Sequence, residues 1–308
     1  MRRMVWRRPV RGTLGGLLAL GLLVPPPAEA APPTTVTGFV DSYPSVASAM
    51  RAAGAPYADW VSSGRSFLDF DPRGDGRIVE VLGDPGTADR IVVLVPGVAS
   101  TLRNFDRGLG GVTRRAPAAQ ARALYDELHA TGPGARVAVL AWLGYDPPDG
   151  VGLTAARPDS ARAGVPALVG LVDVLVRHRP AATVTLVGHS YGALLLGLAG
   201  PALPPQVTAL VSVGGVGMGV DRARELGTGA AVWAAEAPDD WIRWIPALRV
   251  GDVGHGVRPA TPGFGARPLP VDRVSGHDGY LVPGSDTLHA IAQVVLGPDA
   301  TTNGQDVR

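Results

Sequence analysis

Gly188-His189-Ser190-Tyr191-Gly192 is the most informative stretch of this sequence. An apolar, β-rich run over 183–187 precedes it, and a helix-prone run over 193–198 follows it. A serine between two glycines at a strand-to-helix junction is typical of a nucleophile elbow, because the glycines let the strand and the helix approach closely. No other serine has glycine at both of these positions. We therefore predict that Ser190 is a nucleophile at the tip of a sharp turn.

The segments around this turn alternate between apolar strands and helices. Strands are predicted at 91–95, 136–142, 184–187, 207–213 and 230–235, and helices at 116–129, 158–178, 191–199 and 285–296. This alternation predicts an α/β fold with a mostly parallel central sheet and helices on both faces. Strands at 67–70 and 78–82 flank a turn-rich loop and predict an antiparallel hairpin at one edge of the sheet. Ligands are then expected at the carboxyl ends of the parallel strands.

The ends of the chain have a different composition from this central part. Five arginines precede an apolar run over 14–24, and Ala28-Glu29-Ala30 follows it, so residues 1–30 are predicted to be a signal peptide cleaved after Ala30. We expect an N-terminal extension at 31–64, with a helix over 45–61 that is broken near 54–56, then one domain at 65–296 and a loose tail at 297–308. The mature protein is expected to be secreted or extracytoplasmic, with no transmembrane anchor.

Composition argues against several classes of protein. The chain has no lysine, so it contains no phosphate-binding P-loop, and its 42 glycines include no dinucleotide-binding fingerprint. A formal net charge of +1 without a basic stripe argues against nucleic-acid binding. No cysteine is present for disulfides or lipid attachment. Neither a metal nor an organic cofactor is implied, and the oligomeric state stays open.

A serine hydroxyl needs a base within hydrogen-bond reach and an acid that orients the base. Among the histidines after Ser190, we predict His277 as the base, because it follows an expected strand at 271–274 and precedes the last helix. His255 is the alternative base. His289 falls inside the last helix, where a packed or solvated side chain is the simpler interpretation.

The acid is expected after the strand at 230–235. Asp239 and Asp240 follow the end of this strand, and adjacent side chains point in different directions, so only one of them can serve. We favour Asp240, because it leads directly into the apolar segment that begins at Trp241. Asp239 is the alternative, and Glu236 is a poorer third candidate.

The oxyanion hole is predicted from two backbone N–H groups. One belongs to Tyr191, which follows the nucleophile, and the other to the loop after the strand at 91–95, with Val98 as the candidate and Ala99 as the alternative. The apolar residues over 241–248 could line an acyl pocket beside the acid or could belong to the core.

Several short motifs carry a family resemblance. They are Val95-Pro96-Gly97, Asn104-Phe105-Asp106, the elbow at 188–192, Asp239-Asp240-Trp241-Ile242, Pro262-Gly263-Phe264-Gly265-Ala266 and Gly276-His277-Asp278-Gly279-Tyr280. Together, over residues 65–296, they resemble an α/β-hydrolase family that is common in actinobacteria and was long labelled a domain of unknown function. The resemblance implies a Ser-Asp-His hydrolase and supports Ser190 and His277.

These observations favour a secreted serine hydrolase that forms an acyl-enzyme at Ser190. A carboxylic ester, small or lipid-like, is the expected substrate. A peptidase or amidase with the same triad is the nearest alternative, because the residues do not separate ester from amide. A non-catalytic binding protein that retains the fold is the alternative from a different class.

Overall fold

A computed structural model describes residues 39–297 of the 308-residue chain. The predicted signal peptide and residues 298–308 of the predicted tail lie outside this range. The helices are α1 (Phe39–Ala53), α2 (Tyr57–Ser62), α3 (Pro117–Thr131), α4 (Asp159–His178), α5 (Gly192–Ala199) and α6 (Asp286–Leu296). The main strands are β1 (Ser66–Asp71), β2 (Arg77–Gly83), β3 (Arg90–Val95), β4 (Val137–Leu143), β5 (Thr183–His189), β6 (Val207–Val213), β7 (Ala231–Ala235) and β10 (Arg267–Pro268).

These eight strands form one mixed sheet in the order β1-β2-β4-β3-β5-β6-β7-β10. β1 pairs antiparallel with β2, and β2 pairs antiparallel with β4. All other neighbours are parallel. The sequence-based prediction of an α/β fold with an antiparallel N-terminal hairpin is therefore confirmed.

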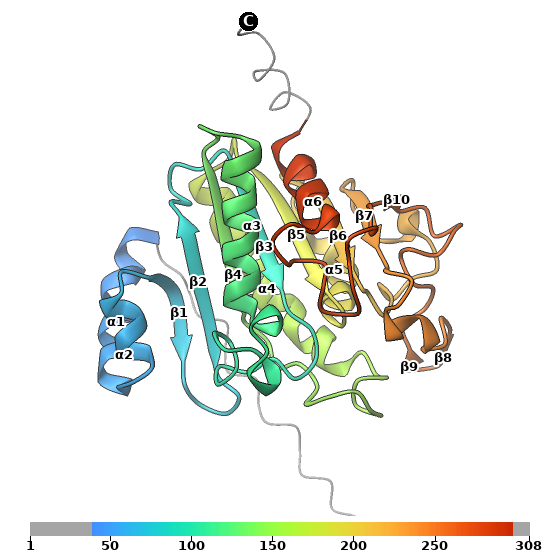
Figure 1. Ribbon diagram of the computed structural model, residues 1–308, viewed down its shortest axis with the longest axis horizontal. Helices are drawn as coiled ribbons and strands as arrows, with labels where there is room; N and C mark the ends of the chain where they lie inside the picture. Colours follow the sequence, from blue (N-terminus) through green and yellow to red (C-terminus); the bar gives the residue numbers. More distant parts are fainter. Residues whose placement is uncertain (1–38, 298–308) are drawn as a thin grey trace, which may run out of the picture. The chain divides into compact units, whose positions relative to one another are not determined.

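Helices cover both faces of the sheet, with α3 and α6 on one side and α4 and α5 on the other (Figure 1). The strands supply both faces by simple alternation. In β3, for example, Ile91, Val93 and Val95 pack into the core with α4 and α5, whereas Val92 and Leu94 pack into the core with α3 and α6. A strand that is buried on both faces explains why the apolar runs in the sequence are nearly continuous.

The N-terminal helices pack beside the hairpin. The break predicted near 54–56 is confirmed, since α1 ends at Ala53 and α2 begins at Tyr57, but α1 begins earlier than expected, at Phe39. Met50 of α1 is fully buried in the core that also contains Phe67 of β1. The ring of Trp60 stacks on that of Phe67 with 6.2 Å between centroids.

The segment between β7 and α6 contains only short elements: the 3₁₀ turn η5 (Trp241–Trp244), the hairpin of β8 (Arg249–Val250) and β9 (Val253–Gly254), and β10. The prediction of a strand over 271–274 is wrong. The Val274 N–H donates to the Val271 carbonyl in a turn, and the N–H groups of Asp272 and Arg273 donate to the carboxylate of Asp286 at the start of α6. Within residues 39–297, no helix combines the length and hydropathy that crossing a membrane requires.

Candidate active site

Ser190 occupies the sharp turn between β5 and α5. Its φ is 54°, a left-handed conformation that is strained for a residue with a side chain, and it is one of two such non-glycine residues in the described chain. The Ser190 N–H donates to the Val213 carbonyl of β6 at 3.0 Å, which fixes the turn at the carboxyl end of the sheet. Both flanking glycines are required, because neighbouring backbone lies too close to them for a side chain. A Cβ at Gly188 would lie 2.7 Å from the Ala193 nitrogen, and one at Gly192 would lie 2.4 Å from the Val95 oxygen.

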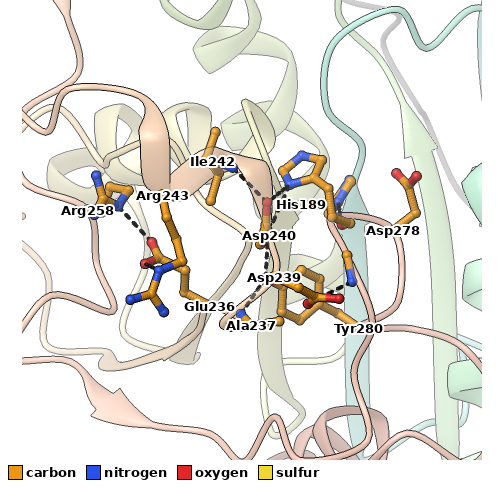
Figure 2. A network of polar contacts seen from close by, with 12 residues as sticks. His189, Glu236, Ala237, Asp239, Asp240, Ile242, Arg243, Arg258, Asp278 and Tyr280 are labelled. Carbon is orange, nitrogen blue, oxygen red and sulfur yellow. Dashed lines mark hydrogen bonds and ion pairs between the residues drawn. The ribbon is translucent and has the colours of Figure 1, made fainter.

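A buried histidine and aspartate meet beside this turn. The Nδ1 of His277 lies 2.9 Å and 3.0 Å from the two carboxylate oxygens of Asp240. Both residues are buried, with 8% and 1% of their surfaces exposed. Asp240 follows the carboxyl end of β7 and caps η5, because its Oδ1 accepts a hydrogen bond from the Ile242 N–H at 2.8 Å. Figure 2 shows Asp240 between Ile242 and Tyr280.

Asp240 is held ionised against the effect of its own burial. Burial favours the neutral acid, but the hydrogen bonds from His277, Tyr280 and the Ile242 N–H outweigh it, and together they lower the pKa of Asp240 below its ordinary value. An ionised carboxylate at Nδ1 keeps the proton of a neutral imidazole on that nitrogen, which leaves Nε2 free to accept another.

The other two candidate acids face elsewhere. The carboxylate of Asp239 accepts hydrogen bonds from the Gly276 N–H at 3.0 Å and from the Ser275 hydroxyl at 3.2 Å, so it fixes the loop that carries the histidine. Glu236 pairs with Arg258 at 2.7 Å and with Arg243 at 3.9 Å (Figure 2). Only Asp240, among the three carboxylates predicted, contacts His277.

The His277 loop lies directly against the elbow. The ring centroids of His277 and His189 are 4.8 Å apart, and the His189 Nε2–H donates to the His277 carbonyl oxygen at 2.8 Å. His277 Nε2 is buried and has no hydrogen-bond partner among residues 39–297, so no hydrogen bond joins it to Ser190 in this structure. Catalytic hydrogen bonds are often long without substrate and tighten when it binds.

His189 stays neutral beside this pair. Burial, followed by the proximity of His277, lowers the pKa of His189 to about 4. A neutral imidazole that donates from Nε2 can hold the His277 backbone without placing a positive charge next to the His277 ring.

The alternative base, His255, is used differently. Its Nε2 lies 2.7 Å from the Ala155 carbonyl oxygen, and its ring stands edge-on to that of Tyr191 with 5.7 Å between centroids. The Tyr191 hydroxyl in turn donates to the Arg157 carbonyl at 2.6 Å. His255 and Tyr191 therefore anchor the loop that precedes α4.

The loop after β3 lies against Ser190. A Cβ at Gly97 would be 2.8 Å from the Ser190 Cβ, and the Pro96 carbonyl accepts a hydrogen bond from the buried Tyr145 hydroxyl at 2.7 Å. The Ala99 N–H donates to the Pro148 carbonyl at 2.7 Å, so it is already engaged. Of the two loop residues considered for the oxyanion hole, Ala99 is therefore the less suitable.

Two features were missed or misread from the sequence. The contact of Tyr280 with Asp240 was missed, although Tyr280 belongs to the Gly-His-Asp-Gly-Tyr motif identified in the sequence. Three of the apolar residues considered for an acyl pocket or the core are exposed instead: Trp244 (85%), Leu248 (54%) and Ile245 (37%). The Trp241 ring contacts the site, with its centroid 4.5 Å from that of His277.

This chain is similar in sequence to other proteins. Two curated relatives, both uncharacterized proteins from strains of Mycobacterium tuberculosis, are 29% identical over 265 residues, which covers 74% of this chain and 38% of each relative. The chain thus spans about two fifths of the length of these relatives.

Solved structures with a similar fold include an α/β serine hydrolase without a lid from Xanthomonas campestris (19% identity, TM-score 0.43, 75% of this chain and 93% of that one). Another is a carboxylesterase from Mesorhizobium loti (16% identity, TM-score 0.44, 75% and 99%). The family model described as alpha/beta hydrolase matches residues 71–250, which is more than half of the chain. This chain therefore belongs to the alpha/beta hydrolase family.

Proposed function

We propose that this protein is a secreted serine hydrolase that cleaves carboxylic esters through an acyl-enzyme at Ser190. The observation that carries the proposal is the buried Asp240–His277 pair, which lies against a strained turn with Ser190 at its tip. A strained, buried serine beside an oriented imidazole matches the demands of nucleophilic catalysis and has no evident structural use.

In the proposed reaction, His277 Nε2 accepts the proton of the Ser190 hydroxyl while Oγ attacks the ester carbonyl carbon. The negative charge that develops on the carbonyl oxygen is stabilised by the N–H groups of Tyr191 and Val98. Collapse of this intermediate breaks the bond to the alcohol, which leaves with the proton from His277. Water then attacks the acyl-enzyme, His277 takes a proton from the water, and this proton returns to Ser190 as the acid departs.

The residues beside the site favour an ester with an apolar acyl group. Trp241 packs over His277, and exposed apolar side chains continue from it along η5 and the β8–β9 hairpin at Trp244, Leu248, Val250 and Val253. Large apolar side chains exposed close together are a common mark of a binding surface. Leu248 also lines an open hollow of about 620 Å³ with Asp221, Arg222 and Arg249, whose lining does not include Ser190 or His277.

A fluorophosphonate probe and an ester panel test this function. We expect the probe to label the purified protein at Ser190 and to leave Ser190→Ala unlabelled, and we expect p-nitrophenyl esters of medium or long acyl chains to be hydrolysed faster than the acetate. An active protein that prefers anilides or peptides would keep the triad but contradict the ester specificity. A folded protein that neither reacts with the probe nor hydrolyses any member of the panel would contradict the hydrolase.

Secretion is part of the same proposal and rests on the sequence of residues 1–30 alone. The N-terminal sequence of the exported protein tests it.

A further inference from the structure

Tyr280 makes two hydrogen bonds that fix the direction of its hydroxyl proton. The hydroxyl lies 2.8 Å from the Ala237 nitrogen and 2.5 Å from Asp240 Oδ2. A backbone N–H can only donate, so the Tyr280 oxygen accepts from Ala237 and its proton points to Asp240. With 1% of its surface exposed, Tyr280 is held in this orientation by the surrounding core.

This contact completes the set of donors around Asp240. The Ile242 N–H reaches Oδ1, the Tyr280 hydroxyl reaches Oδ2, and His277 Nδ1 lies within 3.0 Å of both oxygens, so the carboxylate cannot rotate about its bond without losing a hydrogen bond. The space around this contact is tightly filled. A Cβ at Gly214 would lie 2.9 Å from Asp240 Oδ2 and 3.0 Å from the Tyr280 ring. A water molecule is therefore a poor substitute for the hydroxyl.

We propose that Tyr280 is a positioning residue that holds the Asp240 carboxylate and sets how much negative charge it presents to His277. This inference rests on the proposed function. The competing explanation is that Tyr280 only fills the core, since it packs in the same apolar cluster as Val274 and Leu281. The two explanations differ in whether the hydroxyl affects the reaction through Asp240.

Tyr280→Phe removes the hydroxyl and keeps the ring. Hydrogen bonds to charged groups are among the stronger ones in proteins, so we expect kcat for the preferred ester to fall by roughly 10- to 100-fold with little change in KM. In an Asp240→Asn background the same substitution should cause no further loss of kcat, because the carboxylate through which it acts is gone. A residue that only fills the core would lower kcat by the same factor in both backgrounds.

The pH profile gives a second readout. Without the hydroxyl, Asp240 presents more negative charge to His277 and stabilises the protonated imidazole, so the acidic limb of kcat/KM should move to higher pH. The other titratable groups near the pair are His189, Asp239, Glu236 and Asp278, and the last of these is paired with Arg115 at 2.6 Å. Tyr280→Phe changes none of these groups directly, which makes the shift diagnostic for Tyr280.

Two further variants keep the test sharp if Tyr280→Phe folds poorly. Site-specific 3-fluorotyrosine at position 280 retains the hydroxyl as a stronger donor, so it should keep the fold and move the acidic limb to lower pH. Tyr125→Phe is the matched control, because it removes a tyrosine hydroxyl on α3, outside the site. We expect its kcat and pH profile to equal those of the parent protein.

The outcomes separate this inference from the proposed function. If the parent protein is labelled by fluorophosphonate and hydrolyses esters, but Tyr280→Phe has the parent's kcat and pH profile, the positioning role is refuted and the hydrolase stands. An equal loss in both backgrounds of the double-mutant cycle refutes it as well. A parent protein with neither labelling nor hydrolysis overturns the function and the positioning role together.

Discussion

Asp240→Asn tests the proposed site most directly. The amide occupies the volume of the carboxylate, and the Ile242 N–H at 2.8 Å still requires an acceptor, so the amide oxygen is expected at the Oδ1 position and the NH2 group at Oδ2. The NH2 group then faces His277 Nδ1 and the Tyr280 hydroxyl, both of which donated a hydrogen bond to Oδ2 before. The neutral amide also no longer stabilises the imidazolium that forms in the transition state.

The expected magnitude follows from the geometry. A full charge at 3 to 4 Å from the imidazolium contributes about 4 kcal/mol at the effective dielectric constant of about 20 that suits such sites. Its loss corresponds to a fall in kcat of roughly 1,000-fold, to which the unfavourable amide orientation adds. Hydrolysis of one ester by the purified variant and the parent protein, with melting curves recorded for both, measures this difference.

Asp239→Asn is the matched control one residue away. Asparagine retains a carbonyl oxygen for the Gly276 N–H, and the side chain is exposed, so we expect the free energy of unfolding to change by about 0.5 kcal/mol or less and kcat by about twofold or less. If Asp240→Asn keeps kcat within tenfold of the parent protein while its melting curve is unchanged, Asp240 is not the acid. A severe loss in Asp239→Asn alone would move the role by one residue.

Three further predictions concern the base, a neighbouring histidine and export. Ser190→Ala and His277→Ala should each lower kcat by roughly 10,000-fold or more, and the double variant should be little worse; additive losses would contradict a concerted pair. The pKa of His189 is lowered to about 4 in the folded protein, so between about pH 4 and 6.5 the unfolded chain binds a proton at His189 that the folded protein does not. The free energy of unfolding should therefore fall as the pH drops through that window, and it should fall less in His189→Gln. Denaturant titrations that give the same pH dependence for both proteins would contradict this. N-terminal sequencing of exported protein should begin at Ala31, and an intact Met1 would disprove cleavage.

The helices and strands of the central sheet could be predicted, because the residues that determine them lie within each segment of the sequence. In β3 every residue after Arg90 is buried and apolar, and the elbow is recognisable by glycines that close packing requires. The contact between Asp240 and His277 could also be anticipated, because Asp240 follows the carboxyl end of β7.

The segment between β7 and α6 could not be predicted as well, for reasons that lie in tertiary contacts. Val271–Val274 has the composition of a strand, but Asp286, more than ten residues later, binds two of its backbone N–H groups and holds it as a turn. The apolar residues around Trp244 indicate burial, which the structure does not provide. The role of Tyr280 depends on Ala237 and Asp240, which lie about forty residues earlier in the chain.

The short strand β10 limits the pairing of this sheet edge with a strand of another molecule. It contributes only Arg267 and Pro268 to the sheet, both exposed, and Arg267 folds back so that its guanidinium lies 5.1 Å from the centre of the Trp233 ring. Proline has no N–H to donate, and a two-residue strand offers hardly any backbone for a foreign strand to pair with. This end of the sheet is therefore a poor template for edge-to-edge pairing with another molecule.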